Sequence, residues 1–156
     1  LNALPGSLLE LILEKIIRKC CEIKAEVVSQ DEKEKGIRAI LNFGHTFGHA
    51  IEKLTEYQKF SHGIAVSLGM RVAGRLASLV GLWSPMDEMR QERLLNLYKF
   101  PKKYEVNKSA AWAAMGIDKK ADRGSRVFIL PTEIGKVKTV KDIDQNLIDK
   151  AWDAIL

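Results

Sequence analysis

The three histidines of this chain lie close together in the sequence, at His45, His49 and His62. His45 and His49 are four residues apart, so on a helix their side chains project from the same face. His62 begins a second apolar run, and two helices that each bring a histidine to a shared cleft can build a metal site. Taken alone, a histidine pair with this spacing more often lies on a surface or in a core by chance and binds no metal. The zinc-protease pattern H-E-x-x-H is not present, because Thr46 follows His45.

Two glycines, Gly44 and Gly48, repeat the four-residue spacing of the histidines one position earlier. Glycine has no side chain beyond its hydrogen, so this pair leaves a bare strip along the expected helix. Another backbone or a substrate can come close at such a strip. We therefore expect a close approach beside the histidines.

The segment 42–52, followed by Ser61-His62-Gly63, resembles the signature of the 3-dehydroquinate synthase family. That signature has an arginine, then Leu-Asn-x-Gly-His-x-x-Gly-His-Ala, then His-Gly-Glu-Ala-Val. The matching residues are Arg38, Leu41, Asn42, Gly44, His45, Gly48, His49, Ala50, His62, Gly63, Ala65 and Val66. The similarity extends to 21–28 and 31–32 upstream and to 118–120 and 130–135 downstream, so it covers nearly all of the chain.

The resemblance implies that residues 1–156 form a single C-terminal domain that binds metal and substrate, and that the family's N-terminal NAD-binding domain is absent from this chain. The family's enzyme is a lyase of the shikimate pathway and converts 3-deoxy-arabino-heptulosonate 7-phosphate to 3-dehydroquinate and phosphate. NAD first oxidises a ring hydroxyl, the resulting ketone acidifies the neighbouring C–H so that phosphate can leave, and NADH then returns the hydride. Because half of the active site is absent, we expect the 156-residue chain alone to be inactive.

The resemblance also implies roles for individual residues. His45 and His62 would be ligands of a zinc or cobalt ion, shared with a glutamate that lies upstream of this chain. His49 would face the substrate and form the catalytic set with Lys24 and Asn42. Without the resemblance, Lys24 reads as a solvated helical lysine and Asn42 as a helix cap. Asn42 comes three residues before His45, which predicts that the two share a helical face.

The substrate carries a carboxylate and a phosphate, so cations must converge on the metal cleft. The substrate-binding set implied by the resemblance is Arg38, Glu34, Lys119 and Lys120. Each has a plainer alternative: Arg38 could simply pair with Glu34, and the two lysines could belong to a surface turn.

One position departs from the family pattern, because Ile64 stands where the family has a glutamate after His-Gly. A carboxylate there could orient a ligand histidine by accepting its ring N–H, and isoleucine cannot. Another acid could take over this role, and our two candidates are Glu34 and Glu52.

Two alternatives to the family's reaction remain. The first is another NAD-dependent sugar-phosphate cyclase of the same superfamily, and the second is a non-catalytic fragment or interaction module. As partners we expect a small sugar-phosphate substrate, the N-terminal half of the enzyme and, at full length, a second copy in a homodimer. The net charge of +5 is scattered among acids, which argues against nucleic acid. No stretch is apolar for long enough to span a bilayer, and the adjacent Cys20 and Cys21 suit a reducing cytoplasm.

The elements that must position these residues are mostly helices. At 46% hydrophobic residues, the chain can form a proper core. Its apolar periodicity predicts a mainly α fold, a helical bundle with one small β-hairpin near the C-terminus. The expected helices run from Ser7 to the charge run at 31–35, from Ile37 or Leu41 to Tyr57, and over 62–80, 84–98, 109–115 and 144–155. The expected strands are 126–130 and 136–140, joined by a turn at 131–135.

Overall fold

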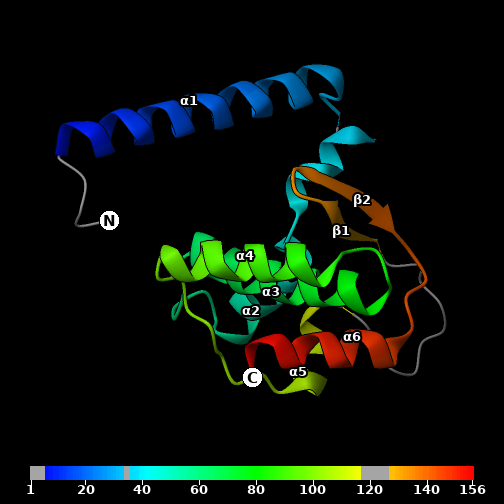
Figure 1. Ribbon diagram of the computed structural model, residues 1–156. Coiled ribbons are helices and arrows are strands. Elements are labelled where there is room, and N and C mark those ends of the chain that lie inside the picture. Colours follow the sequence, from blue (N-terminus) through cyan, green and yellow to red (C-terminus); the bar gives the residue numbers. More distant parts are fainter. Residues whose placement is uncertain (1–5, 34–35, 117–126) are drawn as a thin grey trace. The chain divides into compact units, whose positions relative to one another are not determined.

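The computed structural model describes residues 6–33, 36–116 and 127–156. The fold is mostly helical with one two-stranded antiparallel sheet, as the sequence predicts (Figure 1). The chain divides into two compact units, with the boundary after Leu41. None of the helices in the described ranges is both long and apolar enough to cross a membrane.

The first unit contains the helix α1 (Gly6–Gln30) and most of the short 3-10 helix η1 (Ile37–Asn42). The helix α1 begins one residue before Ser7, the predicted cap, and carries the exposed free thiols of Cys20 and Cys21. Between the helices, a carboxylate oxygen of Asp31 accepts the backbone N–H groups of Gly36 (2.7 Å) and Arg38 (3.0 Å). Large apolar side chains are exposed along α1, namely Leu11, Ile12, Leu13, Ile16, Ile17 and Ile23.

The prediction of one continuous helix from Ile37 or Leu41 to Tyr57 was wrong. The 3-10 helix η1 ends at Asn42, and a separate helix, α2 (His45–Leu54), begins after Gly44. Gly44 has a φ of +79°, a left-handed conformation that glycine adopts readily and that redirects the chain. Consequently Asn42 does not share a helical face with His45, and Gly44 takes the N-cap position of α2.

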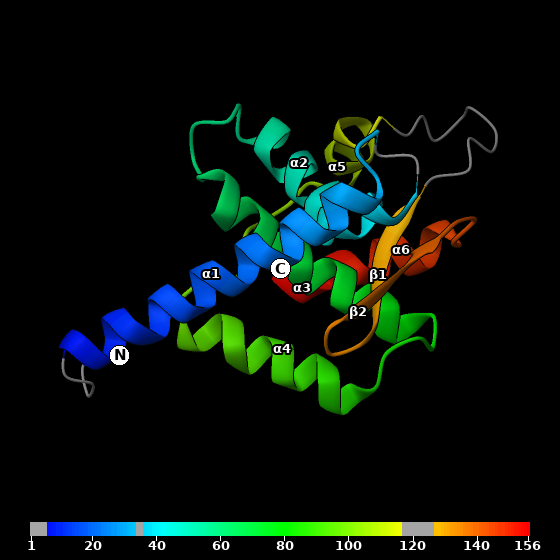
Figure 2. The same ribbon diagram turned by 90° about the horizontal axis from the view of Figure 1, so that it is seen from above.

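The helix α3 (His62–Leu79) is the centre of the second unit and lies between α2 and α4 (Pro85–Leu97) in both views (Figures 1 and 2). Its predicted end is confirmed, with Gly81 at a positive φ of 72°. Where α2 crosses α3, a Cβ atom added to Gly48 would lie 3.1 Å from the Cα of Val66. A Cβ added to Gly69 would lie 2.1 Å from the carbonyl oxygen of Gly44 and 2.6 Å from the backbone nitrogen of Gly48. The backbone of α3 therefore packs directly against the expected bare strip of glycines.

The remaining elements close the core around α3. They are α5 (Lys108–Ala114), β1 (Phe128–Glu133), β2 (Lys136–Val140), α6 (Gln145–Ala151) and the 3-10 helix η2 (Trp152–Ile155). The predicted caps Ser84 and Asp144 accept backbone N–H groups at the starts of α4 and α6. The predicted turn at 131–135 was wrong in extent, because Pro131 lies within β1 and the turn is Ile134-Gly135. In the core, the ring of Phe47 packs against Phe128 and Trp152, at centroid distances of 5.7 and 5.2 Å.

The crossing of α2 and α3 generates a stability prediction. We expect Gly69→Ala to lower the free energy of unfolding by about 1–3 kcal/mol, because the added methyl group would overlap backbone atoms that cannot move aside separately. Gly63→Ala is the matched control on the same helix, since a Cβ there meets nothing within 4 Å. It should be neutral or stabilising by up to about 1 kcal/mol. Denaturant unfolding measures both, and equal effects of the two substitutions would contradict the tight crossing.

Candidate metal and substrate site

The crossing of α2 and α3 brings the three histidines together. His45 and His49 lie on successive turns of α2, and His62 is the first residue of α3. The ring centroids are 5.2 Å apart for His45 and His62, 5.5 Å for His45 and His49, and 5.7 Å for His49 and His62. Three imidazoles from two helices therefore surround one small space, as the sequence suggested.

The segment between the two helices returns the chain to this space. It continues from α2 through Glu56 and Tyr57, which both have positive φ angles. Near its end, the ring of Phe60 packs edge-on against Tyr104 at a centroid distance of 5.2 Å. This contact fixes the chain two residues before His62, so the start of α3 is anchored as well as its middle.

A buried carboxylate, that of Glu52, connects two of the three histidines. One oxygen of Glu52 lies 2.7 Å from Nδ1 of His49, and the other lies 2.9 Å from Nδ1 of His62. The Glu52 side chain is only 7% exposed, whereas the side chains of His49 and His62 are 53% and 56% exposed. The carboxylate therefore forms the floor of the site, and the two rings stand between it and the solvent.

The third histidine has its own acceptor. Nδ1 of His45 lies 3.2 Å from the backbone carbonyl oxygen of Phe43. All three rings thus use Nδ1 for a hydrogen bond to oxygen, which leaves Nε2 of each ring for another partner. An imidazole whose other nitrogen donates to a carboxylate or a carbonyl is the usual form of a metal-binding histidine.

The surroundings of Glu52 have opposite effects on its pKa. Burial raises the pKa, but the hydrogen bonds from His49 and His62, and the positive charge of these rings when they are protonated, lower it, and the result lies below the ordinary value of 4.5. Glu52 is therefore ionised at neutral pH and acts as a hydrogen-bond acceptor.

The donor set suits a transition metal such as zinc or cobalt, for which imidazole and carboxylate are common ligands. Ligand atoms of His49, Glu52 and His62 all lie within 4.8 Å of one another. Both oxygens of Glu52 are already engaged by ring N–H groups, so the imidazoles are the better ligands. His45 is not part of this group, although its ring centroid lies 5.2 Å from that of His62 and 5.5 Å from that of His49. The choice of His45 and His62 as the ligands rests on the family resemblance.

Three of the other predicted site residues are among those that the structure describes. Lys24 is exposed on α1 in the first unit. Arg38, in η1, donates from Nη1 to the carbonyl oxygen of Glu32 at 2.8 Å. Asn42 is half-buried at the end of η1, where the second unit begins. The remaining three, Glu34, Lys119 and Lys120, lie outside the described residues.

Sequence reasoning named Glu52 only as a stand-in for the family glutamate missing at Ile64, and not as a site residue. A signal for it was present, because Glu52 follows His45 by seven residues and His49 by three, which places all three on one face of α2. Ile64 is half-buried and lies two residues after His62 on α3. Residues with that separation on a helix do not face each other.

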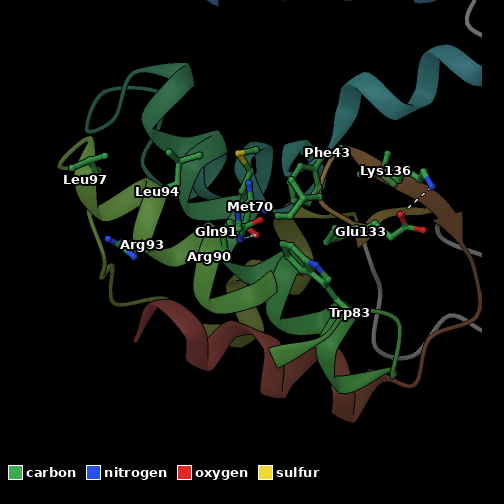
Figure 3. Close-up of a pocket in the computed structure, with 14 residues that line it drawn as sticks. Phe43, Met70, Trp83, Arg90, Gln91, Arg93, Leu94, Leu97, Glu133 and Lys136 are labelled. Carbon is green, nitrogen blue, oxygen red and sulfur yellow. Dashed lines mark hydrogen bonds and ion pairs between the residues drawn. The ribbon is translucent and has the colours of Figure 1, made fainter. Parts of the chain in front are cut away.

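A separate hollow of about 550 Å³ lies between α3, α4 and the hairpin (Figure 3). Much of its lining is apolar, including Phe43, Met70, Trp83 and Leu94. One side chain in it bridges two helices, because Nε2 of Gln91 donates to the carbonyl oxygen of Met70 at 2.9 Å. The hollow shares no residue with the histidine cluster.

Comparisons with known proteins give the class to which this fold and site belong. The model of the 3-dehydroquinate synthase C-terminal family matches residues 5–121, so the chain belongs to this family. It is 43% identical to the 3-dehydroquinate synthase of a Synechococcus strain over 99% of this chain and 41% of that protein. It is 47% identical to the enzyme of the same name from Prochlorococcus marinus, over 88% of this chain and 38% of that protein. The chain thus spans about two fifths of the length of these relatives.

Solved structures give the same fold. A 2-deoxy-scyllo-inosose synthase complexed with carbaglucose-6-phosphate, NAD⁺ and Co²⁺ is 26% identical, with a TM-score of 0.75 over 92% of this chain and 42% of that one. The 2-epi-5-epi-valiolone synthase of Streptomyces hygroscopicus, with NAD⁺ and Zn²⁺ bound, is 25% identical, with a TM-score of 0.76 over 94% of this chain and 39% of that one.

The lowered pKa of Glu52 predicts how its contribution to stability depends on pH. A carboxyl whose pKa is lower in the folded state stabilises the fold above its unfolded pKa and loses that effect as the pH falls through the folded value. We therefore expect the difference in free energy of unfolding between the wild type and Glu52→Gln to shrink as the pH drops below 4.5. Denaturant unfolding at several pH values measures this difference. A difference that stays constant between about pH 7 and about pH 3 would contradict the assignment.

Proposed function

We propose that this chain is the C-terminal part of a 3-dehydroquinate synthase, a lyase that converts 3-deoxy-arabino-heptulosonate 7-phosphate to 3-dehydroquinate and phosphate in the shikimate pathway. The observation that carries the proposal is the grouping of His45, His49 and His62 over buried Glu52, in a chain that belongs to this family.

His45 and His62 are our proposed metal ligands, together with a glutamate from the upstream half of the enzyme. The Zn²⁺ and Co²⁺ bound by the related synthases support the presence of a metal ion in the proposed enzyme. A bound ion of this kind supplies Lewis-acid polarisation of the substrate's hydroxyl and ketone oxygens. His49, whose side chain is about half exposed, is reached by ligands from the solvent side. Its Nε2 is the atom that can exchange a proton with the substrate or its leaving phosphate.

The substrate's two anionic groups require fixed cations, and Arg38, Lys119 and Lys120 are the proposed ones, with Glu34 in the same binding set. Lys24 and Asn42 complete the catalytic set with His49. The upstream half would bind NAD, which carries the hydride, while the residues of this chain orient the substrate and its charges. At full length we propose a homodimer, and the free thiols suit a cytoplasmic protein.

A second candidate is another sugar-phosphate cyclase of the same superfamily. The likeness to 2-deoxy-scyllo-inosose synthase and 2-epi-5-epi-valiolone synthase favours it. The identity to these two is 25–26%, compared with 43% and 47% to proteins called 3-dehydroquinate synthase, which makes the latter the better choice. Offering each substrate class to the full-length enzyme would distinguish the two.

The third candidate, a fragment without turnover, describes the 156-residue chain by itself. We predict that this chain forms no detectable 3-dehydroquinate, since the NAD-binding half and one metal ligand are missing. Addition of that half, in the same chain or in trans, should restore activity. Product formation by the purified chain alone, followed together with phosphate release, would show that its active site is complete and would refute the prediction that the chain by itself is inactive.

The division of labour among the histidines can be tested in the full-length enzyme. His45→Ala and His62→Ala should each lower the metal content after dialysis and abolish turnover, because each removes a ligand. His49→Ala should retain the metal and lower kcat by about 10²–10⁴-fold, the range typical of a lost general acid or base. Metal analysis and steady-state kinetics measure these effects. Loss of metal from the His49 variant, with retention in the His45 variant, would reverse the assignment.

A further inference from the structure

We propose that Glu52 is a positioning residue that fixes the proton of two histidines at once, holding His49 and His62 both in the Nδ1–H form. Each of its carboxylate oxygens accepts a hydrogen bond from Nδ1 of one ring, at 2.7 Å for His49 and 2.9 Å for His62. Nothing in the family resemblance assigned such a role to this residue, and the glutamate expected after His62-Gly63 is replaced by Ile64.

The chemistry of the carboxylate determines the form of both rings. An ionised carboxylate has acceptor sites and no donor. Each neutral imidazole that meets it through Nδ1 must therefore carry its proton on that nitrogen, which leaves the lone pair on Nε2. Since the Glu52 side chain is only 7% exposed, water does not readily replace either hydrogen bond. A buried polar group that loses its hydrogen-bond partner costs more free energy than one at the surface. Loss of either hydrogen bond to Glu52 is therefore unfavourable, and both rings are held in the Nδ1–H form.

The third ring provides an internal reference. His45 is held by the backbone carbonyl of Phe43, at 3.2 Å from its Nδ1, and not by Glu52. A change at Glu52 should therefore alter the protonation pattern of the other two rings and leave that of His45 as it was.

The shared carboxylate also couples the two histidines. Its position on α2 is fixed, so a movement of one ring that breaks its hydrogen bond leaves the other ring as the main partner of a buried charge. On the proposed function, on which this part of the inference rests, Glu52 thereby links a metal ligand, His62, to the substrate-facing His49. One acid then performs two orienting roles.

Replacement of Glu52 by glutamine makes a sharp test. Glutamine has nearly the same shape, but it offers one acceptor oxygen and one NH₂ donor. Its oxygen can accept a hydrogen bond from one ring and keep that ring in the Nδ1–H form. Its NH₂ group faces the other ring and can form a hydrogen bond only if Nδ1 of that ring carries a lone pair. In Glu52→Gln, one of His49 and His62 should move its proton to Nε2 or rotate away.

The measurement is the long-range ¹H–¹⁵N spectrum of the histidine rings in the 156-residue chain, which distinguishes the two tautomers of each ring. In the wild type, we expect His49 and His62 both as Nδ1–H. In Glu52→Gln, one of them should change and His45 should not. Glu56→Gln, the same chemical change at an exposed carboxylate two residues after the end of α2, is the matched control and should leave all three rings as in the wild type.

The outcomes separate this inference from the proposed function. An Nε2–H form of His49 or His62 in the wild type overturns the inference even if the glutamine variant fails to fold, and so do unchanged rings in a folded glutamine variant. Zinc affinity, measured by competition with a chelator, should fall by about 10–100-fold in Glu52→Gln and not in Glu56→Gln. If the tautomers respond as expected while zinc affinity does not change, the positioning role stands and the metal part of the proposed function fails.

Discussion

The close crossing of α2 and α3 is the constraint on which the rest of the site depends. At Gly69 the two backbones are so near that a single methyl group would overlap atoms of Gly44 and Gly48. Glycine is the residue that permits this approach, and Gly44 in addition supplies the left-handed turn from which α2 begins. Because the helices touch here, the first residue of α3 lies beside the first and second turns of α2. His62 thus joins His45 and His49 although it lies 13 positions after the nearer of the two in the sequence.

The site contains a buried carboxylate charge at this crossing, and neighbouring side chains compensate for it. Burying an ionised carboxylate is costly unless hydrogen bonds and opposite charge compensate for the lost hydration. For Glu52 the compensation comes from two imidazole N–H groups, and it outweighs burial enough to lower the pKa. The helix that carries Glu52 is itself held in the core, through Phe47 packed against Phe128 and Trp152. The face of α2 that carries the histidines and the face that packs in the core are therefore different sides of one helix.

The sequence predicted those features that depend on local chemistry. Capping by Ser84 and Asp144, the end of α3 before Gly81, and the bare strip at Gly44 and Gly48 all follow from the intrinsic properties of the residues. The break between η1 and α2 could not be predicted in this way, because apolar periodicity continues across Gly44 and glycine adopts left-handed and right-handed conformations about equally readily. For the same reason the predicted position of Asn42 relative to His45 was wrong.

The candidate site was predictable in part. Helical spacing accounts for His45 and His49, and the family resemblance added His62. Glu52 was recognisable as a neighbour of the histidines on one helix face, but its bond to His62 arises from tertiary structure. Lys24, Arg38, Lys119 and Lys120 were named from the resemblance alone, and their roles stay predictions.

Two helices of this fold bring their three histidines together. Paramagnetic Co²⁺ tests this most directly, because it broadens the NMR signals of nearby ring protons. On titration of Co²⁺ into the 156-residue chain, we expect the signals of His45, His49 and His62 to broaden together at the same metal concentration. In Gly69→Ala, where the crossing is forced apart, the signal of His62 should no longer follow those of the other two. Broadening confined to the α2 histidines in the wild type, with His62 unaffected, would show that the histidines of the two helices do not share one metal site.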